Sequence, residues 1–194
     1  MDFSMTKTDP NNITNYDRTY SELEQFWLFC MFAAGKNSDW AATKVEQLLV
    51  DRPEHQSPFS YLQSMGGVWL RHALTGIRSG QYNRLYRAIG QSLSVDLYNC
   101  TLEDLLAIYG VGPKTARLFV VHSRKQAQHA VLDTHILRWM GEQGITVPKT
   151  TPAHKKYLQL EKQCIELFQK HYPNLSIAQA DLHVWKLQRS QQSI

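Results

Sequence analysis

Cysteine and long apolar runs are scarce in this chain of 194 residues. The three cysteines (Cys30, Cys100 and Cys164) lie far apart and match no zinc or iron–sulfur spacing. We therefore expect reduced thiols and neither a metal nor any other cofactor. The longest apolar run, residues 26–34, is too short to cross a bilayer, and the N-terminus lacks the apolar core of a signal peptide. These absences predict a cytoplasmic protein with no membrane partner.

Strand-like alternation is also scarce, whereas apolar residues at helical spacing recur along the chain. The composition, with 43% hydrophobic and 20% charged residues, is ordinary for a globular protein and argues against extended disorder. We predict an all-α protein with a flexible N-terminal arm at residues 1–18. The expected helices cover residues 20–34, 39–50, 81–93, 101–108, 155–169 and 178–187, and another begins near residue 114.

The most informative stretch begins at residue 101. Thr101 and Asp104 fit a loose capping box at the start of a short helix. That helix runs into residues 110–113 (Gly-Val-Gly-Pro), where the glycines permit uncommon backbone conformations and the proline suits the first turn of a new helix. The pattern predicts a tight hairpin whose amides bind a phosphate at a helix N-terminus. A β-branched residue at Gly112 is expected to block this hairpin.

A lysine and an aspartate follow the hairpin glycines. Lys114 comes directly after the proline, and Asp133 lies in the run Val-Leu-Asp-Thr-His at residues 131–135. The net charge of +4 fits a polyanionic partner, although by itself it is weak evidence. An amine and a carboxylate beside a clamp for the phosphate backbone indicate chemistry on DNA.

Residues 110–116 (GVGPKTA) and 132–138 (LDTHILR) together resemble the paired motifs of the helix-hairpin-helix DNA glycosylase superfamily, which includes endonuclease III and 8-oxoguanine glycosylase. The resemblance implies one catalytic unit, residues 19–194, made of two helical lobes with the hairpin in residues 61–137. Residues 19–60 and 138–194 would form the second lobe. No iron–sulfur cluster is expected, because the four-cysteine loop of endonuclease III is missing.

The resemblance also implies roles for single residues. Lys114 matches the nucleophilic lysine of the members that are also lyases, and Asp133 matches their catalytic aspartate. A carboxylate stabilises the positive charge that builds on the sugar, and an unprotonated lysine forms a Schiff base at C1′ that permits strand cleavage, the AP lyase reaction. The expected DNA-binding residues are Gly110, Val111, Gly112, Lys114, Thr115, Arg117 and Lys36. The expected pocket residues are Gly35, His122, Arg124 and His135.

The expected partner is double-stranded DNA with a modified base flipped out of the stack, bound by a monomer. The sequences around Gly35-Lys36 and His122-Ser123-Arg124 leave a second hypothesis open, because they resemble a phage branch of the fold linked to thymidine hypermodification. Such an enzyme would transfer an amino acid or amine donor onto pyrophosphorylated 5-hydroxymethyluracil in DNA. A third hypothesis is a non-catalytic DNA-binding module in which Lys114 contacts a phosphate and Asp133 caps a helix. All three place the protein with the nucleoid, in a bacterial or phage-infected cytosol.

Overall fold

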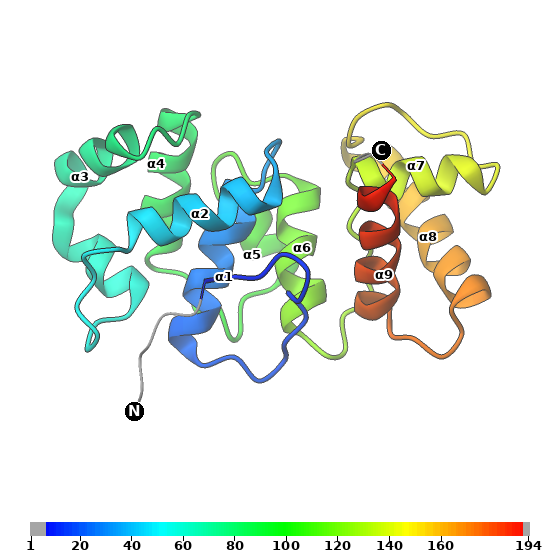
Figure 1. Ribbon diagram of the computed structural model, residues 1–194, viewed down its shortest axis with the longest axis horizontal. Coiled ribbons are helices and arrows are strands. Elements are labelled where there is room, and N and C mark those ends of the chain that lie inside the picture. The colour runs from blue at the N-terminus through cyan, green and yellow to red at the C-terminus, as the bar shows by residue number, and fades with distance from the viewer. Residues whose placement is uncertain (1–6, 192–194) are drawn as a thin grey trace. The chain divides into compact units, whose positions relative to one another are not determined.

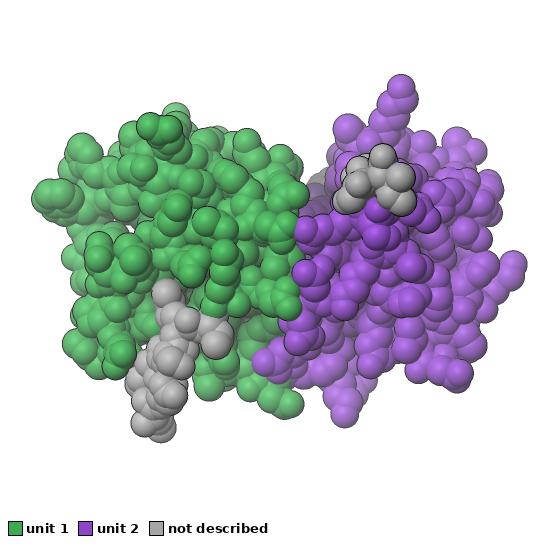
Figure 2. Space-filling view, in the orientation of Figure 1, with its two compact units in different colours: residues 1–10, 17–112 green, residues 11–16, 113–194 purple. Residues whose placement is uncertain are grey.

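The computed structural model describes residues 7–191, and within that range it contains nine helices and no strand (Figure 1). The prediction of an all-α protein is therefore confirmed. As far as the chain is described, it forms two compact units, one from residues 1–10 and 17–112 and the other from residues 11–16 and 113–194 (Figure 2). No helix in residues 7–191 combines the length and the apolar character needed to span a membrane.

This division differs from the lobes expected from the sequence, which were residues 61–137 and residues 19–60 with 138–194. The boundary falls between Gly112 and Pro113, inside the hairpin motif. The N-terminal helices contact the helices that follow them directly in the chain, so residues 19–60 belong with residues 61–112. Helical packing here follows chain order, and the crossing of the chain between lobes that the resemblance implied is absent from the described residues, apart from residues 11–16.

The described part of the expected arm also packs on the protein. Lys7 donates to Thr43 at 3.1 Å and pairs with Glu46 at 3.3 Å, and the Ile13 side chain is buried. The amide of Asn15 donates to a carbonyl of the second unit at 3.1 Å. Residues 7–18 therefore have specific contacts, whereas residues 1–6 of the expected arm lie outside the described residues.

The first unit is built around one central helix. Its helices are α1 (Tyr20–Phe32), α2 (Ser38–Leu48), α3 (Pro58–Gly76), α4 (Tyr82–Ser92) and α5 (Leu102–Leu106). In α1 every residue from Leu23 to Phe32 is buried, as expected for a helix that is apolar on all sides, and α2, α3 and α4 pack against it. The indole of Trp27 donates to Ser92 at 2.8 Å, which satisfies its only polar group.

The helices expected from the sequence do not include α3, which contains the pair Gly66-Gly67. The chain is helical on both sides of Gly66, which itself has φ 72° and ψ 165° and kinks the helix. A Cβ at Gly67 would lie 2.6 Å from the hydroxyl oxygen of Tyr86, so a glycine here allows α3 to pack closely on α4. The two glycines thus mark a kink and a close helix contact.

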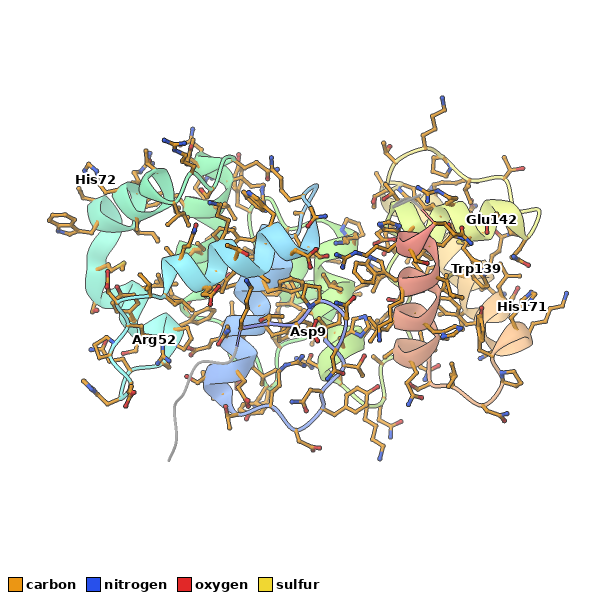
Figure 3. The ribbon with its side chains drawn as sticks, in the orientation of Figure 1. Asp9, Arg52, His72, Trp139, Glu142 and His171 are labelled. Atoms are coloured by element: carbon orange, nitrogen blue, oxygen red, sulfur yellow. The ribbon has the colours of Figure 1, made fainter. Side chains whose placement is uncertain are left out.

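The second unit contains α6 (Pro113–Ser123), α7 (Thr134–Glu142), α8 (His154–His171) and α9 (Ile177–Ser190). Helix α9 contacts the other three. In the core of this unit, Trp139 stacks on Phe168 with ring centres 5.3 Å apart and meets the edge of His171 at 5.9 Å (Figure 3). Both residues that carry the expected chemistry, Lys114 and Asp133, belong to this unit.

Candidate active site

The turn before α6 requires glycine at position 110. Gly110 has φ +74°, in the left-handed region that other residues rarely adopt. Arg84 covers it, with one guanidinium nitrogen donating to the carbonyl of Gly110 at 3.4 Å and another to that of Met31 at 2.8 Å. A Cβ at Gly110 would lie 2.4 Å from Cγ of Arg84. The amide of Val111 closes the turn by donating to the carbonyl of Ile108 at 3.1 Å.

Gly112 has a different environment. Its φ lies outside the left-handed region, and an added Cβ would meet no heavy atom of the described residues within 4 Å. The expectation that a β-branched residue here blocks the hairpin is therefore not supported by local geometry. The open space beside Gly112 instead leaves room for a second molecule to approach the backbone.

Tyr109, which precedes the turn, is anchored to α4. Its amide donates to Gln91 at 2.6 Å, and the guanidinium of Arg87 lies 3.6 Å from the centre of its ring. Because α4 also supplies Arg84, this helix holds both ends of the glycine turn.

Lys114 is the second residue of α6 and is partly exposed. Within residues 7–191, its Nζ makes no hydrogen bond or ion pair with another residue. The other expected DNA contacts on this helix are placed differently, since the side chains of Thr115 and Arg117 are buried. Arg117 is only 4% exposed and is paired with Glu161, so its guanidinium is not available to a phosphate.

The two remaining DNA-binding candidates lie in the first unit. Val111 is buried, with 8% of its surface exposed, so only its backbone remains for a ligand. Lys36 is exposed, and its Nζ lies 5.4 Å from the ring centre of Trp40. Exposed groups suited to a phosphate backbone are therefore found at Gly110, Gly112, Lys114 and Lys36.

Asp133 caps α7. Its Oδ1 accepts hydrogen bonds from the amides of His135 and Ile136, each at 2.9 Å, while its own backbone is extended. This N-cap satisfies amides that would otherwise lack partners, and the helix dipole favours the negative charge there. Among residues 7–191, Oδ2 has no hydrogen-bond partner. One oxygen of Asp133 thus fixes the side chain and the other is left for a ligand.

The four expected pocket residues are divided between the two units. Gly35 forms an exposed turn after α1 in the first unit, with φ +68°, whereas the other three belong to the second unit. His122 is fully buried between Thr14 (2.8 Å) and Asp181 (3.2 Å), so it does not line an open pocket. Arg124 follows the end of α6 and is partly exposed.

His135 is the expected pocket residue that stays beside Asp133. Its half-buried ring meets the edge of Trp185, with ring centres 5.8 Å apart. Burial lowers the pKa of His135, and the nearby charge of Asp133 opposes this only in part. The neutral imidazole is therefore the favoured form at neutral pH.

A buried ion pair next to the site was missed by the sequence interpretation. Arg117 binds Glu161 through two nitrogens, Nε to Oε1 at 2.6 Å and Nη2 to Oε2 at 2.9 Å. His129 Nδ1 lies 3.3 Å from the same carboxylate. Burial alone would raise the pKa of Glu161, but the hydrogen bonds from His129 and Arg117 outweigh it and hold this pKa below the usual range.

A second buried carboxylate was missed as well. Asp181 on α9 accepts from the amide of Val131 at 3.4 Å and pairs with His122. Burial raises the pKa of Asp181, and His122 opposes that shift. The sequence contains a signal for the burial of both acids. Each lies among apolar residues at helical spacing, on the side of its helix that faces the core. The buried residues of these apolar stripes are Tyr157, Leu160, Glu161, Cys164 and Phe168 on α8, and Ala178, Asp181 and Val184 on α9.

No protein-family model matches the chain. Its fold is similar to that of the 8-oxoguanine glycosylase/lyase of Methanocaldococcus jannaschii, solved in complex with a 15mer DNA containing 8-oxoguanine. The TM-score is 0.69 and the sequences are 19% identical, over 90% of this chain and 84% of that chain. The chain therefore has the helical glycosylase fold that its paired motifs predicted.

Proposed function

We propose that this protein is a DNA glycosylase with AP lyase activity that acts on a damaged or modified base. One observation carries the proposal: the second unit holds an amine and a carboxylate oxygen that are both left without partners among the described residues. Within residues 7–191, Lys114 Nζ has no ion pair, and Oδ2 of Asp133 has no donor although Oδ1 has two. Both groups are partly exposed, so each can be reached by a ligand, and an amine and a carboxylate are the two groups that the glycosylase and lyase reaction needs.

The chemistry assigns one step to each group. The lone pair of the Lys114 amine attacks C1′ of the nucleotide, and the base departs with the electron pair of the N-glycosidic bond and takes up the proton that the amine loses. Asp133 stabilises the positive charge that develops on the sugar as this bond breaks. Opening of the sugar gives a Schiff base on Lys114, and β-elimination then releases the 3′-phosphate.

Binding of DNA is assigned to the glycine turn and the start of α6, which are adjacent in the chain. The open space at Gly112 allows close approach of a phosphate, and Lys114 supplies a positive charge two residues later. Lys36 is a separate exposed cation of the first unit that is also suited to a phosphate. Such contacts are made to the backbone of DNA and carry no sequence information, so recognition of the target base must come from other groups.

Borohydride trapping tests the covalent step. Wild-type protein incubated with a duplex that contains one abasic site should give a covalent adduct after reduction, because borohydride converts the Schiff base to a stable amine. Lys114→Ala should abolish this adduct. Lys125→Ala, which removes another exposed lysine just beyond the end of α6, is the matched control and should leave the adduct unchanged. An adduct that persists in Lys114→Ala would refute the assignment of the nucleophile.

A further inference from the structure

Residues 130–132, which precede Asp133 at the start of α7, are held by buried side chains and not by a neighbouring strand. The segment is neither helical nor part of a sheet, yet it is completely buried. Its three consecutive amides each donate to a different buried side chain. The pairs are Ala130 with Glu161 at 3.1 Å, Val131 with Asp181 at 3.4 Å, and Leu132 with the hydroxyl of Tyr157 at 3.0 Å.

The carbonyls of the same segment are also bonded. In chain order they accept from the hydroxyl of Tyr157 at 3.0 Å, from the amide of Asp133 at 2.9 Å and from the hydroxyl of Thr151 at 3.0 Å. All six backbone groups of residues 130–132 therefore have a partner, and the Tyr157 hydroxyl serves two of them. A backbone held at every donor and acceptor has little freedom to shift.

The groups that hold this segment are themselves fixed from α6. Arg117 lies one helical turn after Lys114 and binds both oxygens of Glu161. The same guanidinium also lies over the aromatic ring of Tyr157, with Cζ of Arg117 4.5 Å from the centre of that ring. A continuous set of contacts thus runs from the helix that carries Lys114 to the segment that carries Asp133.

Stability is a poor explanation for this arrangement. Arg117, Glu161 and Asp181 are each less than 10% exposed, and the desolvation of buried ions offsets most of their mutual attraction. Apolar residues would fill the same core at no such cost. What the polar groups add is one defined backbone conformation.

We propose that Tyr157, Glu161 and Asp181 are positioning residues for Asp133. They fix residues 130–132 so that Asp133 reaches the N-cap of α7 with Oδ2 directed to the substrate. This inference rests on the proposed function, because it assigns what holds the carboxylate of that site. A displacement of a catalytic group by about 1 Å can slow a reaction by roughly a hundredfold.

Tyr157→Phe is the sharpest test, because it removes only the hydroxyl that serves two backbone groups. The probe is a duplex with one abasic site, and the readouts are the rate of the borohydride-trapped adduct at saturating protein and the Kd for that duplex. We expect the rate to fall by about tenfold or more while Kd changes by less than about twofold. Phe168→Leu, a core change on the same helix that leaves every hydrogen-bond partner of residues 130–132 in place, should leave the rate within about twofold of wild type.

The same substitution made in Asp133→Asn protein separates a positioning role of Tyr157 from a general loss of structure. In Asp133→Asn protein, Tyr157→Phe should slow the reaction little further, because there is no carboxylate left to position. If Tyr157→Phe lowers the rate by the same factor in wild-type protein and in Asp133→Asn protein, its role is merely structural and the proposal is overturned. If Tyr157→Phe does not fold, Asp181 provides the same test. Asp181→Asn keeps an oxygen acceptor for the Val131 amide and should retain most of the rate, whereas Asp181→Leu should not.

The outcomes distinguish the two proposals. Wild-type protein that forms no adduct with the abasic duplex would overturn the proposed lyase function, and the positioning role with it. An adduct that forms at equal rates in wild type and Tyr157→Phe would leave the function standing and overturn the positioning role alone.

Discussion

Substituting Gly110 by alanine should destabilise the first unit far more than the same change at Gly112. An alanine at position 110 must adopt a left-handed backbone conformation, which costs an L-residue with a Cβ about 1–2 kcal/mol. It would also lie 2.4 Å from Cγ of Arg84, so this side chain must move. Moving it breaks the guanidinium hydrogen bonds to Gly110 and Met31, and a hydrogen bond to a charged group contributes about 1.5–3 kcal/mol. We expect Gly110→Ala to lower the free energy of unfolding by about 3 kcal/mol or more.

Gly112→Ala is the matched control. The added Cβ has room beside the described residues, and the backbone at position 112 has a φ that alanine readily adopts. The loss of unfolding free energy should therefore stay below about 1 kcal/mol, the usual cost of alanine at a helix N-cap. Urea unfolding followed by circular dichroism measures both variants. Equal losses at the two positions would refute the geometry described for the turn. If a phosphate approaches Gly112, this well-folded variant should still bind duplex DNA more weakly than wild type.

Two further predictions concern charge. The pKa of Glu161 in the folded protein lies below its unfolded value of about 4.3, so the ionised carboxylate stabilises the fold at neutral pH. This contribution to the free energy of unfolding is lost as the pH falls through the lowered pKa of the folded state. The loss of unfolding free energy in Glu161→Gln should therefore be largest near pH 7 and shrink below about pH 4 in urea titrations, and a constant difference would contradict this. Lys36→Ala should weaken binding to all duplex sequences alike and reduce the slope of log K against log salt by about 1 in fluorescence anisotropy, and an unchanged slope would remove Lys36 from the interface.

Local signals in the sequence predicted local structure well. The capping box of Thr101 and Asp104 is present in both directions, with the Asp104 amide donating to Thr101 and the Thr101 amide donating back to Asp104. The helix that begins near residue 114 starts at Pro113, where the proline predicted it. Such features depend on residues three or four positions apart, so the sequence contains all the information they need.

Long-range partners explain what was not predicted. Arg117 was expected to contact DNA, but it is buried in an ion pair whose other member, Glu161, lies on a helix far along the chain. The division into two units also depends on long-range packing, since it follows from which helices contact one another. Helix α3 was missed because Gly66 has a conformation that interrupts the helix without ending it. The apolar stripes around Glu161 and Asp181 are the signal that would have identified buried acids.

The central claim is that Lys114 and Asp133 act on the glycosidic bond of a base in DNA, and Asp133→Asn tests it most directly. Asparagine caps a helix as well as aspartate does, so α7 should stay intact and Kd for DNA should stay close to wild type. The measurement is mass spectrometry of digested duplexes that carry a panel of modified bases, after incubation with wild type or Asp133→Asn. We predict a released free base and an abasic site with wild type, and a rate lower by roughly a hundredfold or more with the variant. An intact, heavier thymidine nucleoside that forms only when an activated hydroxymethyl group and an amine donor are both present would contradict the claim.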